Sequence, residues 1–163
     1  MSLSVRRAQP DDAAAISRVL VASITALCTA DHGNDPAVIA AWTANKSEAN
    51  ILVMLSGSES TIFVVEQDAE IVGVGAIAGP SISLNYVDPR HRCKGVSSTL
   101  LATLEAELVM RGVDVAELKS TATARAFYLS QGWVESAPAT PGRFISAHPM
   151  RKRLSSVLTS SGQ

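Results

Sequence analysis

Cysteine and histidine are scarce in this chain of 163 residues, which holds two cysteines and three histidines. Cys28 and Cys93 are too few for a disulfide framework, and neither they nor the histidines have the spacing of zinc ligands. A disulfide-stabilised secreted scaffold is therefore excluded. We expect no metal site, and a reduced, cytoplasmic setting.

An excess of charge of either sign is also missing. Fourteen basic and fifteen acidic residues give a net charge of −1. The short basic cluster 151–153 is typical of a solvated strand end, so no nucleic-acid partner is predicted. No apolar run approaches the ~18 residues of a membrane span. The N-terminus lacks a signal pattern, and we expect no membrane partner.

What the chain does have is enough apolar character for a core. Hydrophobic residues make up 47% of it, and its length fits one domain. We expect a single domain over residues 1–153. Residues 154–163 form a serine-rich tail that we expect to be flexible.

Hydrophobic periodicity and turn residues predict the element order β–α–α–β–β–β–α–β–α–β–β. The strands are expected at 3–8, 61–66, 71–78, 81–87, 113–118, 133–137 and 144–150, and the helices at 13–30, 36–46, 95–111 and 121–130. Residues 47–55 are expected to form a further turn or helix. The helix between strands 81–87 and 113–118 favours a parallel pairing of these two. The predicted fold class is α/β, a mixed and mostly antiparallel sheet of about seven strands with helices on both faces.

The segment 87–101 reads as a strand end, a proline turn, a polar loop and a helix start. Arg90, Arg92 and Lys94 flank the loop. Unpaired backbone N–H groups at a helix N-terminus favour an anion, so this segment predicts a phosphate site.

The hexapeptide Arg92-Cys93-Lys94-Gly95-Val96-Ser97 resembles the (Gln/Arg)-x-x-Gly-x-(Gly/Ala) signature of the GNAT N-acyltransferase superfamily. In that family the loop amides hold the pyrophosphate of acetyl-coenzyme A. Cys93 stands where the family usually has Gly, and Ser97 where it has Gly or Ala. Both added side chains crowd a loop whose backbone must approach phosphate.

A second stretch, 121–133, resembles the GNAT segment Asn-x-x-Ala-x-x-Phe-Tyr-x-x-x-Gly-(Phe). Ala124, Phe127, Tyr128 and Gly132 fall in register, and Thr121 replaces the common Asn. Together the two matches imply the GNAT acyl-CoA N-acyltransferase fold.

The resemblance also implies roles for single residues. Tyr128 would be the general acid that protonates the departing thiolate; the alternative is a tyrosine packed on the sheet. A bulged fourth strand would offer backbone N–H groups from 84–87 to the acyl oxygen and pantetheine arm. The implied cofactor-binding residues are Tyr86, Val87, Arg92, Cys93, Lys94, Gly95, Val96, Ser97, Ser98, Thr121 and Tyr128.

The base that deprotonates the acceptor is less defined. Glu117, on strand 113–118, is either this base or a surface carboxylate. His148, His32 and Glu66 are weaker candidates, and a water chain can serve instead. In the family, the segment between the first two helices walls the acceptor pocket. Asp31, His32 and Trp42 would bind a cationic amine there; alternatively they form a capped loop and a core tryptophan.

The first hypothesis is an acetyl-CoA-dependent N-acetyltransferase that acts by direct attack in a ternary complex. Its acceptor is a primary amine of a small molecule, or alternatively a peptide N-terminus or lysine. The second hypothesis is a non-catalytic acyl-CoA-binding sensor or interaction domain. A Rossmann dinucleotide site is excluded because no Gly-x-Gly-x-x-Gly follows the first strand. As in many members of the family, a homodimer is expected.

Overall fold

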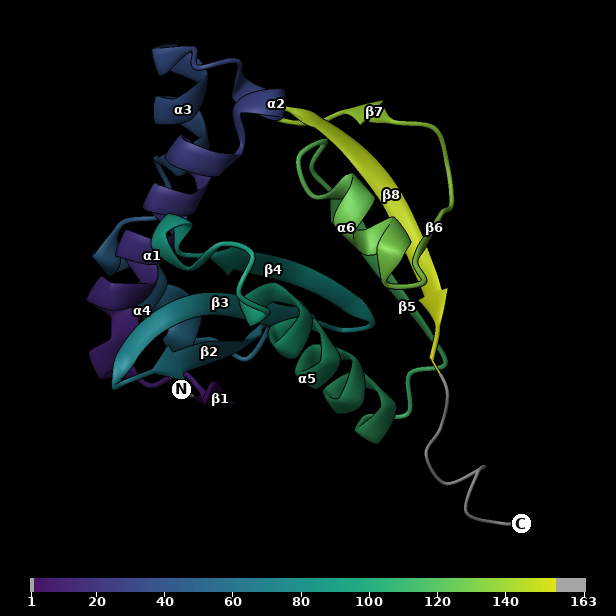
Figure 1. Cartoon of the computed structure of the whole chain (residues 1–163), viewed down its shortest axis with the longest axis horizontal. Helices are drawn as coiled ribbons and strands as arrows, with labels where there is room; N and C mark the ends of the chain where they lie inside the picture. Colours follow the sequence, from purple (N-terminus) through teal and green to yellow (C-terminus); the bar gives the residue numbers. More distant parts are fainter. Residues whose placement is uncertain (1, 155–163) are drawn as a thin grey trace.

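A computed structural model describes residues 2–154 (Figure 1). Its elements are β1 (Ser4–Arg7), η1 (Pro10–Asp12), α1 (Ala13–Leu27), α2 (Thr29–His32), α3 (Pro36–Thr43), α4 (Glu48–Ser56), β2 (Thr61–Gln67), β3 (Glu70–Ala78), β4 (Ser81–Val87), η2 (Pro89–His91), α5 (Val96–Met110), β5 (Val115–Ser120), α6 (Arg125–Ser130), β6 (Val134–Glu135), β7 (Thr140–Pro141) and β8 (Ser146–Arg153).

The strands form one sheet in the order β1-β2-β3-β4-β5-β8-β6, with β7 added to β8. Neighbours run antiparallel except β4 and β5, which are parallel. Helices lie on both faces of this sheet (Figure 1). The predicted fold class is therefore confirmed, and the strand beyond the expected seven is the two-residue β7.

The sheet opens between β4 and β5. These strands are paired at only two positions, the second joining Ile82 to Leu118. Ser83 then forms a bulge, because the register of β4 against β3 shifts by one residue there. Within the described chain, residues 84–87 pair with β3 but have no partner on β5. A bulged β4 that diverges from β5 is what the family resemblance implied.

Helix α5 approaches one face of β3 closely. Gly73 and Gly75 lie on that face. A Cβ atom at Gly73 would be 2.7 Å from Val96, and one at Gly75 would be 2.9 Å from Leu100 and Leu104. Because both residues are glycines, α5 can lie directly against β3, and this contact fixes the position of the N-terminus of α5.

Helices α1 and α4 cover the opposite face of the same strands. Ile16, Val19 and Leu20 recur at helical spacing on α1, are fully buried and pack with Val64 and Val74. This layer fixes the position of the C-terminal end of α1, which reaches the opening between β4 and β5.

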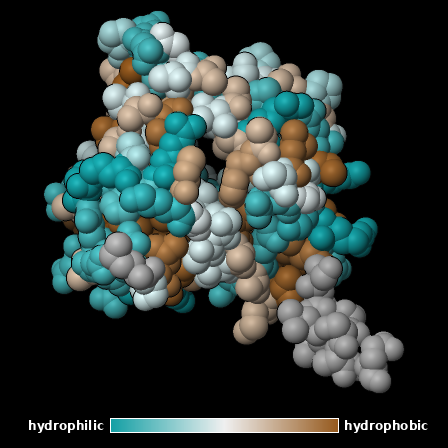
Figure 2. All heavy atoms as spheres, viewed as in Figure 1, coloured by the Kyte–Doolittle hydropathy of each residue, from teal (hydrophilic) through white to brown (hydrophobic). Residues whose placement is uncertain are grey.

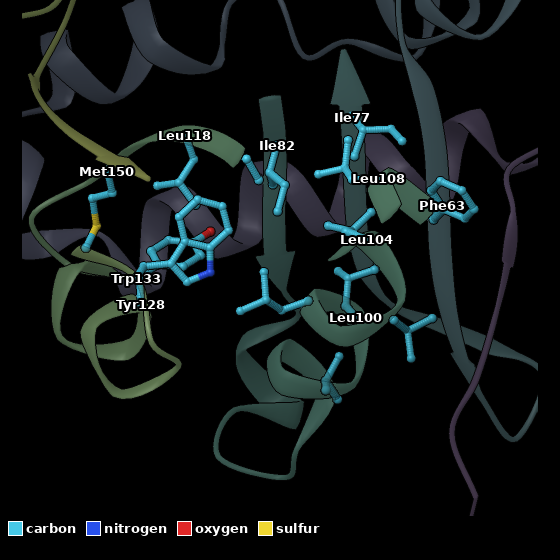
Figure 3. Packing of buried hydrophobic residues seen from close by; sticks show 14 of the residues in the cluster. Phe63, Ile77, Ile82, Leu100, Leu104, Leu108, Leu118, Tyr128, Trp133 and Met150 are labelled. Carbon is cyan, nitrogen blue, oxygen red and sulfur yellow. The ribbon is translucent and has the colours of Figure 1, made fainter. Parts of the chain in front are cut away.

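The second half of the sheet carries α6 on the same side as α5 (Figure 1). Figure 3 shows Tyr128 and Trp133 lying together beside Leu118 and Met150. The two aromatic rings meet edge to face, with centroids 6.0 Å apart. The indole N–H of Trp133 donates to Glu105 of α5 at 3.1 Å, which ties α5 to the segment that follows α6.

Several element boundaries differ from the sequence expectation. The helix expected at 13–30 breaks at Cys28, whose ψ of 36° is not helical, and α2 follows. The helix expected at 121–130 begins at Arg125, since the Thr121 hydroxyl accepts a hydrogen bond from the Ala124 N–H at 3.0 Å in a preceding turn. The last strand, expected at 144–150, is Ser146–Arg153.

The domain boundary expected after residue 153 stays a prediction. Leu154, the first residue beyond it, donates its backbone N–H to the Asp114 carbonyl at 2.8 Å and packs on the core. Residues 155–163 of the predicted tail lie outside the described residues.

Candidate active site

A cavity of about 380 Å³ occupies the opening between β4 and β5. Its walls come from both layers of the fold. Leu27 and Cys28 at the end of α1 lie on one side, and Ser97 of α5 and Tyr128 of α6 line it as well. The space-filling view shows the surface hollowed between the two halves of the molecule (Figure 2). This is a route along which an extended ligand can cross the sheet.

The loop before α5 forms one end of the cavity. Gly95 precedes the helix with a φ of +82°, and Cys93 has a φ of +63°. The Thr99 N–H donates to the Gly95 carbonyl at 3.0 Å, so the amides of residues 96–98 come before the helical hydrogen-bond ladder. Such amides, together with the helix dipole, bind an anion.

The residues predicted to hold the cofactor converge on this cavity, with one exception. Those that line it are Tyr86, Val87, Arg92, Cys93, Gly95, Val96, Ser97, Ser98, Thr121 and Tyr128. Lys94 does not line it, and its side chain is exposed in the loop. Their role in cofactor binding stays a prediction that this placement supports.

Tyr128 combines burial with a position on the cavity wall. It is 5% exposed, and its ring is held edge to face between Phe127 and Trp133. Burial raises the pKa of its phenol to about 12, and the neighbouring Asn85 side chain opposes the rise. The phenol is therefore protonated at neutral pH, which is the state a general acid needs.

Asn85 is a site residue that the sequence reading did not single out. It lines the cavity from β4, and both polar atoms of its amide are buried without a hydrogen-bond partner among the described residues. His91 also lines the cavity, with a buried and unpartnered Nδ1. An asparagine among apolar residues is unusual in a strand, and this signal was available in the sequence.

Asp31 was predicted to bind the acceptor, but its carboxylate is already occupied. It accepts hydrogen bonds from the Ala122 N–H at 2.7 Å, the Thr123 N–H at 3.1 Å and the Thr123 hydroxyl at 2.6 Å. These bonds hold the turn before α6. Asp31 does not line the cavity, so we reassign it from acceptor binding to positioning this turn.

His32 and Trp42 are likewise structural. The imidazole is buried, with Nε2 2.8 Å from the Ile24 carbonyl and Nδ1 accepting the Asn34 N–H at 2.9 Å. Trp42 packs with Ile24 and Cys28. Neither lines the cavity. The alternative of a capped loop and a core tryptophan therefore describes them better than acceptor binding does.

Glu117, the predicted base, faces away from Tyr128. Along β5 the side chains of Ala116 and Leu118 are buried, whereas Glu117 is exposed between them. It lines a separate hollow with Lys119 and Arg151. Because its side chain alternates to the other face of the strand, Glu117 is the surface carboxylate of the two alternatives.

Acidic side chains are missing from the cavity wall within residues 2–154. The ionisable groups that line it are Cys28, Tyr86, His91, Arg92, Cys93, Lys119 and Tyr128. Burial raises the pKa of the Cys28 thiol to about 12 and also raises that of the Tyr86 phenol. Both groups are protonated at neutral pH and cannot accept a proton there.

Two broader features concern the described residues as a whole. None of their helices is both long and apolar enough to cross a bilayer. No three side chains of His, Cys, Asp or Glu within residues 2–154 come together as a possible metal site.

The fold and sequence match known acetyltransferases. A GCN5-related N-acetyltransferase from Rhodopseudomonas palustris superposes with a TM-score of 0.84 at 26% identity, over 94% of this chain and 97% of that one. The PaiA N-acetyltransferase of Thermoplasma acidophilum, solved with coenzyme A, gives 0.79 at 20% identity, over 94% and 99%. YncA of Salmonella typhimurium, solved with its cofactor acetyl-CoA, gives 0.63 at 22% identity, over 95% of each chain.

Among curated proteins, none matches the sequence at a significant level. The family model described as "Acetyltransferase (GNAT) domain" matches residues 16–154, which is most of the chain. This stretch includes both sequence motifs and the whole cavity wall. The protein therefore belongs to the GNAT acetyltransferase family.

Proposed function

We propose that the protein is an acetyl-CoA-dependent N-acetyltransferase that acts on the primary amine of a small molecule within a ternary complex. The observation that carries this proposal is the cavity itself. It joins the start of α5 to Tyr128. An anion site and a buried acid in one passage are what acyl transfer from a thioester of a pyrophosphate-bearing carrier requires.

Acetyl-CoA would lie across the sheet. Its pyrophosphate would meet the amides of residues 96–98, with Arg92 close by on the cavity wall. The pantetheine arm would follow the edge of β4 at 84–87, where backbone groups face the opening and not another strand. PaiA was solved with coenzyme A and YncA with acetyl-CoA, and the shared fold supports carrying this cofactor over.

The chemistry then follows from the position of Tyr128. The amine nitrogen attacks the thioester carbon, a C–N bond forms and the C–S bond breaks. The attacking nitrogen, which is cationic once it has bonded to the carbon, releases one proton to water. The departing thiolate takes the phenol proton of Tyr128, and the phenolate recovers a proton from solvent. A pKa of about 12 ensures that the proton is present on Tyr128 before the reaction at neutral pH.

The acceptor side favours an amine of low basicity. No carboxylate of residues 2–154 lines the cavity, and the buried Cys28 and Tyr86 are protonated at neutral pH. The proton of an ammonium acceptor would therefore leave to water or to the imidazole of His91, whose Nδ1 is buried on the same cavity wall without a partner among the described residues. An α-amine, with a pKa of about 8, holds a much larger neutral fraction at pH 7 than an alkyl amine with one near 10.

The test is turnover with a panel of amines, followed by mass spectrometry of the acetylated product. In the Tyr128→Phe variant we expect kcat to fall about 10²- to 10⁴-fold, the usual contribution of a general acid, while acetyl-CoA still binds. Tyr86→Phe is the matched change because it removes the other phenol of the same cavity; we expect a much smaller loss. Equal turnover of wild type and Tyr128→Phe would contradict the assigned role.

A non-catalytic acyl-CoA-binding module is the second candidate. Two observations favour it: the left-handed Cys93 in the anion loop and the lack of a carboxylate on the described cavity wall. Such a module would bind acetyl-CoA but acetylate no amine of the panel at any pH between 6 and 9. Multiple turnovers with any of them would exclude it.

A further inference from the structure

The amide of Asn85 is an unsatisfied polar group in the interior of the cavity. Its Nδ2 and Oδ1 atoms are both buried, and neither has a hydrogen-bond partner among the described residues. Burying an amide without partners costs free energy, so such groups are rare unless a ligand or a water completes them. A group of this kind on the wall of a ligand cavity marks a point of function.

The strand register places this amide on the side of the sheet that carries Tyr128. Asn85 lies directly opposite Gly75 of β3, and directly paired residues project to the same face. The face of Gly75 is the one that contacts α5. Asn85 and Tyr128 therefore face one cavity, one from β4 and the other from α6.

The tyrosine ring itself has little freedom. Phe127 and Trp133 hold it edge to face at centroid distances of 5.4 and 6.0 Å. What this packing does not fix is the direction of the phenol O–H bond, which rotates about the C–O axis. A general acid is useful only when that bond points toward the atom that receives its proton.

We propose that Asn85 is a positioning residue for Tyr128: when the cofactor occupies the cavity, the Nδ2–H that now lacks a partner donates to the phenol oxygen, which leaves the phenol proton directed at the departing sulfur. The same donor stabilises the phenolate that remains after proton transfer. The Oδ1 atom of Asn85 is then free to accept from a water or from an N–H group in the cavity. This inference rests on the proposed acetyl transfer through Tyr128.

The electrostatics agree with a donor and not an acceptor. The Asn85 side chain is close enough to the phenol to lower its pKa, although burial remains the larger influence and raises it. No carboxylate of the described chain lines this cavity. Asn85 is the side chain that lowers the pKa of this phenol, and a donor from it would partly offset the burial of a phenolate.

Three variants test whether Asn85 acts on Tyr128 as a hydrogen-bond donor. Asn85→Leu removes donor and acceptor with little change of size. Asn85→Asp keeps an acceptor oxygen, loses the donor and adds negative charge. Asn50→Leu makes the same chemical change as the first at an exposed position on α4 and serves as the control. Circular dichroism and acetyl-CoA binding establish that each variant is folded.

The first readout does not depend on turnover. The chain has two tyrosines, so Tyr86→Phe leaves Tyr128 as the single site for biosynthetic 3,5-difluorotyrosine. Fluorination makes the phenol more acidic and brings its titration, followed by absorbance, into a range that a folded protein tolerates. Asn85→Leu should raise the pKa of residue 128 by about 1 pH unit, as expected for loss of a hydrogen bond to a charged group. Asn85→Asp should raise it further, because it places a like charge beside the phenolate.

The second readout is a double-mutant cycle on kcat. Asn85→Leu should lower kcat about 10-fold, leave KM for acetyl-CoA nearly unchanged, and have no further effect in the Tyr128→Phe background. Asn50→Leu should change none of these values. Additive losses, or an unchanged titration of residue 128, would overturn the role of Asn85. Absence of turnover in wild type, with the titration still shifted, would instead overturn the proposed function.

Discussion

The carboxylate of Asp31 accepts two hydrogen bonds from Thr123, one from its hydroxyl at 2.6 Å and one from its N–H at 3.1 Å. These residues are 92 positions apart in the chain. The contact ties α2 to the turn that leads into α6, the helix of Tyr128. A residue predicted to bind the acceptor thus anchors the turn that leads to Tyr128, the proposed general acid.

Asp31→Ala should therefore weaken both the fold and the reaction. Loss of the acceptor leaves the Ala122 and Thr123 N–H groups unpartnered, and we expect the free energy of unfolding in urea to fall by about 1–3 kcal/mol. Turnover should fall as well, because α6 loses its anchor. Asp35→Ala is a matched control, since Asp35 caps only α3, through the Ala37 N–H at 2.9 Å. It should cost about 1 kcal/mol and leave kcat unaltered; an equal kcat loss in both variants would contradict this account.

Replacement of Cys93 by Gly should stabilise the protein. Cys93 has a φ of +63°, a left-handed conformation that costs a residue with a Cβ atom about 1–2 kcal/mol. Part of that gain is lost because glycine makes the unfolded chain more flexible. We expect the free energy of unfolding to rise by about 0.5–1 kcal/mol. Lys94→Gly, at the next exposed position, lacks the positive φ and should destabilise; if both variants lose stability, Cys93 is not strained.

Gly73 should not tolerate a side chain. A Cβ atom there would lie 2.7 Å from Val96, the first residue of α5, so Gly73→Ala must push the helix N-terminus away from β3. Overpacking of this kind costs about 1–3 kcal/mol, and the displaced loop should also bind acetyl-CoA more weakly. The control is Gly57→Ala, whose new Cβ would meet nothing nearer than 3.6 Å. Wild-type stability and affinity in Gly73→Ala would show that the close approach is unimportant.

Asp88 should contribute to stability only above acidic pH. A hydrogen bond from Arg90 lowers the pKa of this carboxyl below its ordinary 3.8, against the opposing effect of burial. A depressed pKa stabilises the folded state at pH values above the ordinary one, and the contribution disappears as pH falls through the folded value. In urea titrations at several pH values, wild type should exceed Asp88→Asn in stability at pH 7, by a margin that shrinks below about pH 4. If the stability difference between wild type and Asp88→Asn stays constant down to pH 3, the ion pair of Asp88 with Arg90 does not contribute to stability.

Much of the fold was predictable because its signals are local. The strand and helix periodicities predicted the order of strands and α-helices from β2 to α6, whereas α1 to α4 precede β2 where the predicted order has two helices. Asp35 before Pro36 indicated the start of α3, whose N-cap it is. The predicted helix boundaries were wrong where the chain forms a short turn in place of the expected helix, as at Cys28 and at 121–124. Hydrophobic spacing does not distinguish a helix from a helix-like turn, so those boundaries depend on single hydrogen bonds.

The residues of the site were also predicted correctly where the signal is local and wrongly where it depends on distant partners. Tyr128 and the loop 92–98 were identified because sequence motifs carry them, and the structure brings them to one cavity. Asp31, His32 and Glu117 were misplaced because their partners are distant in sequence or because strand alternation decides which face they occupy. Asn85 was missed although an asparagine within a strand is an unusual residue, and its lack of a hydrogen-bond partner is visible only in the packed structure.

The most direct test of the account is calorimetric titration of the purified protein with acetyl-CoA, with free CoA and NADH as comparisons. The account predicts one molecule of acetyl-CoA bound per chain with micromolar affinity and no binding of NADH, because the β4–β5 opening and the amides of 96–98 suit an acyl-pantetheine pyrophosphate. If neither acetyl-CoA nor CoA binds, the cavity is not a cofactor site. The proposed acetyl transfer and the role of Tyr128 would then both be contradicted.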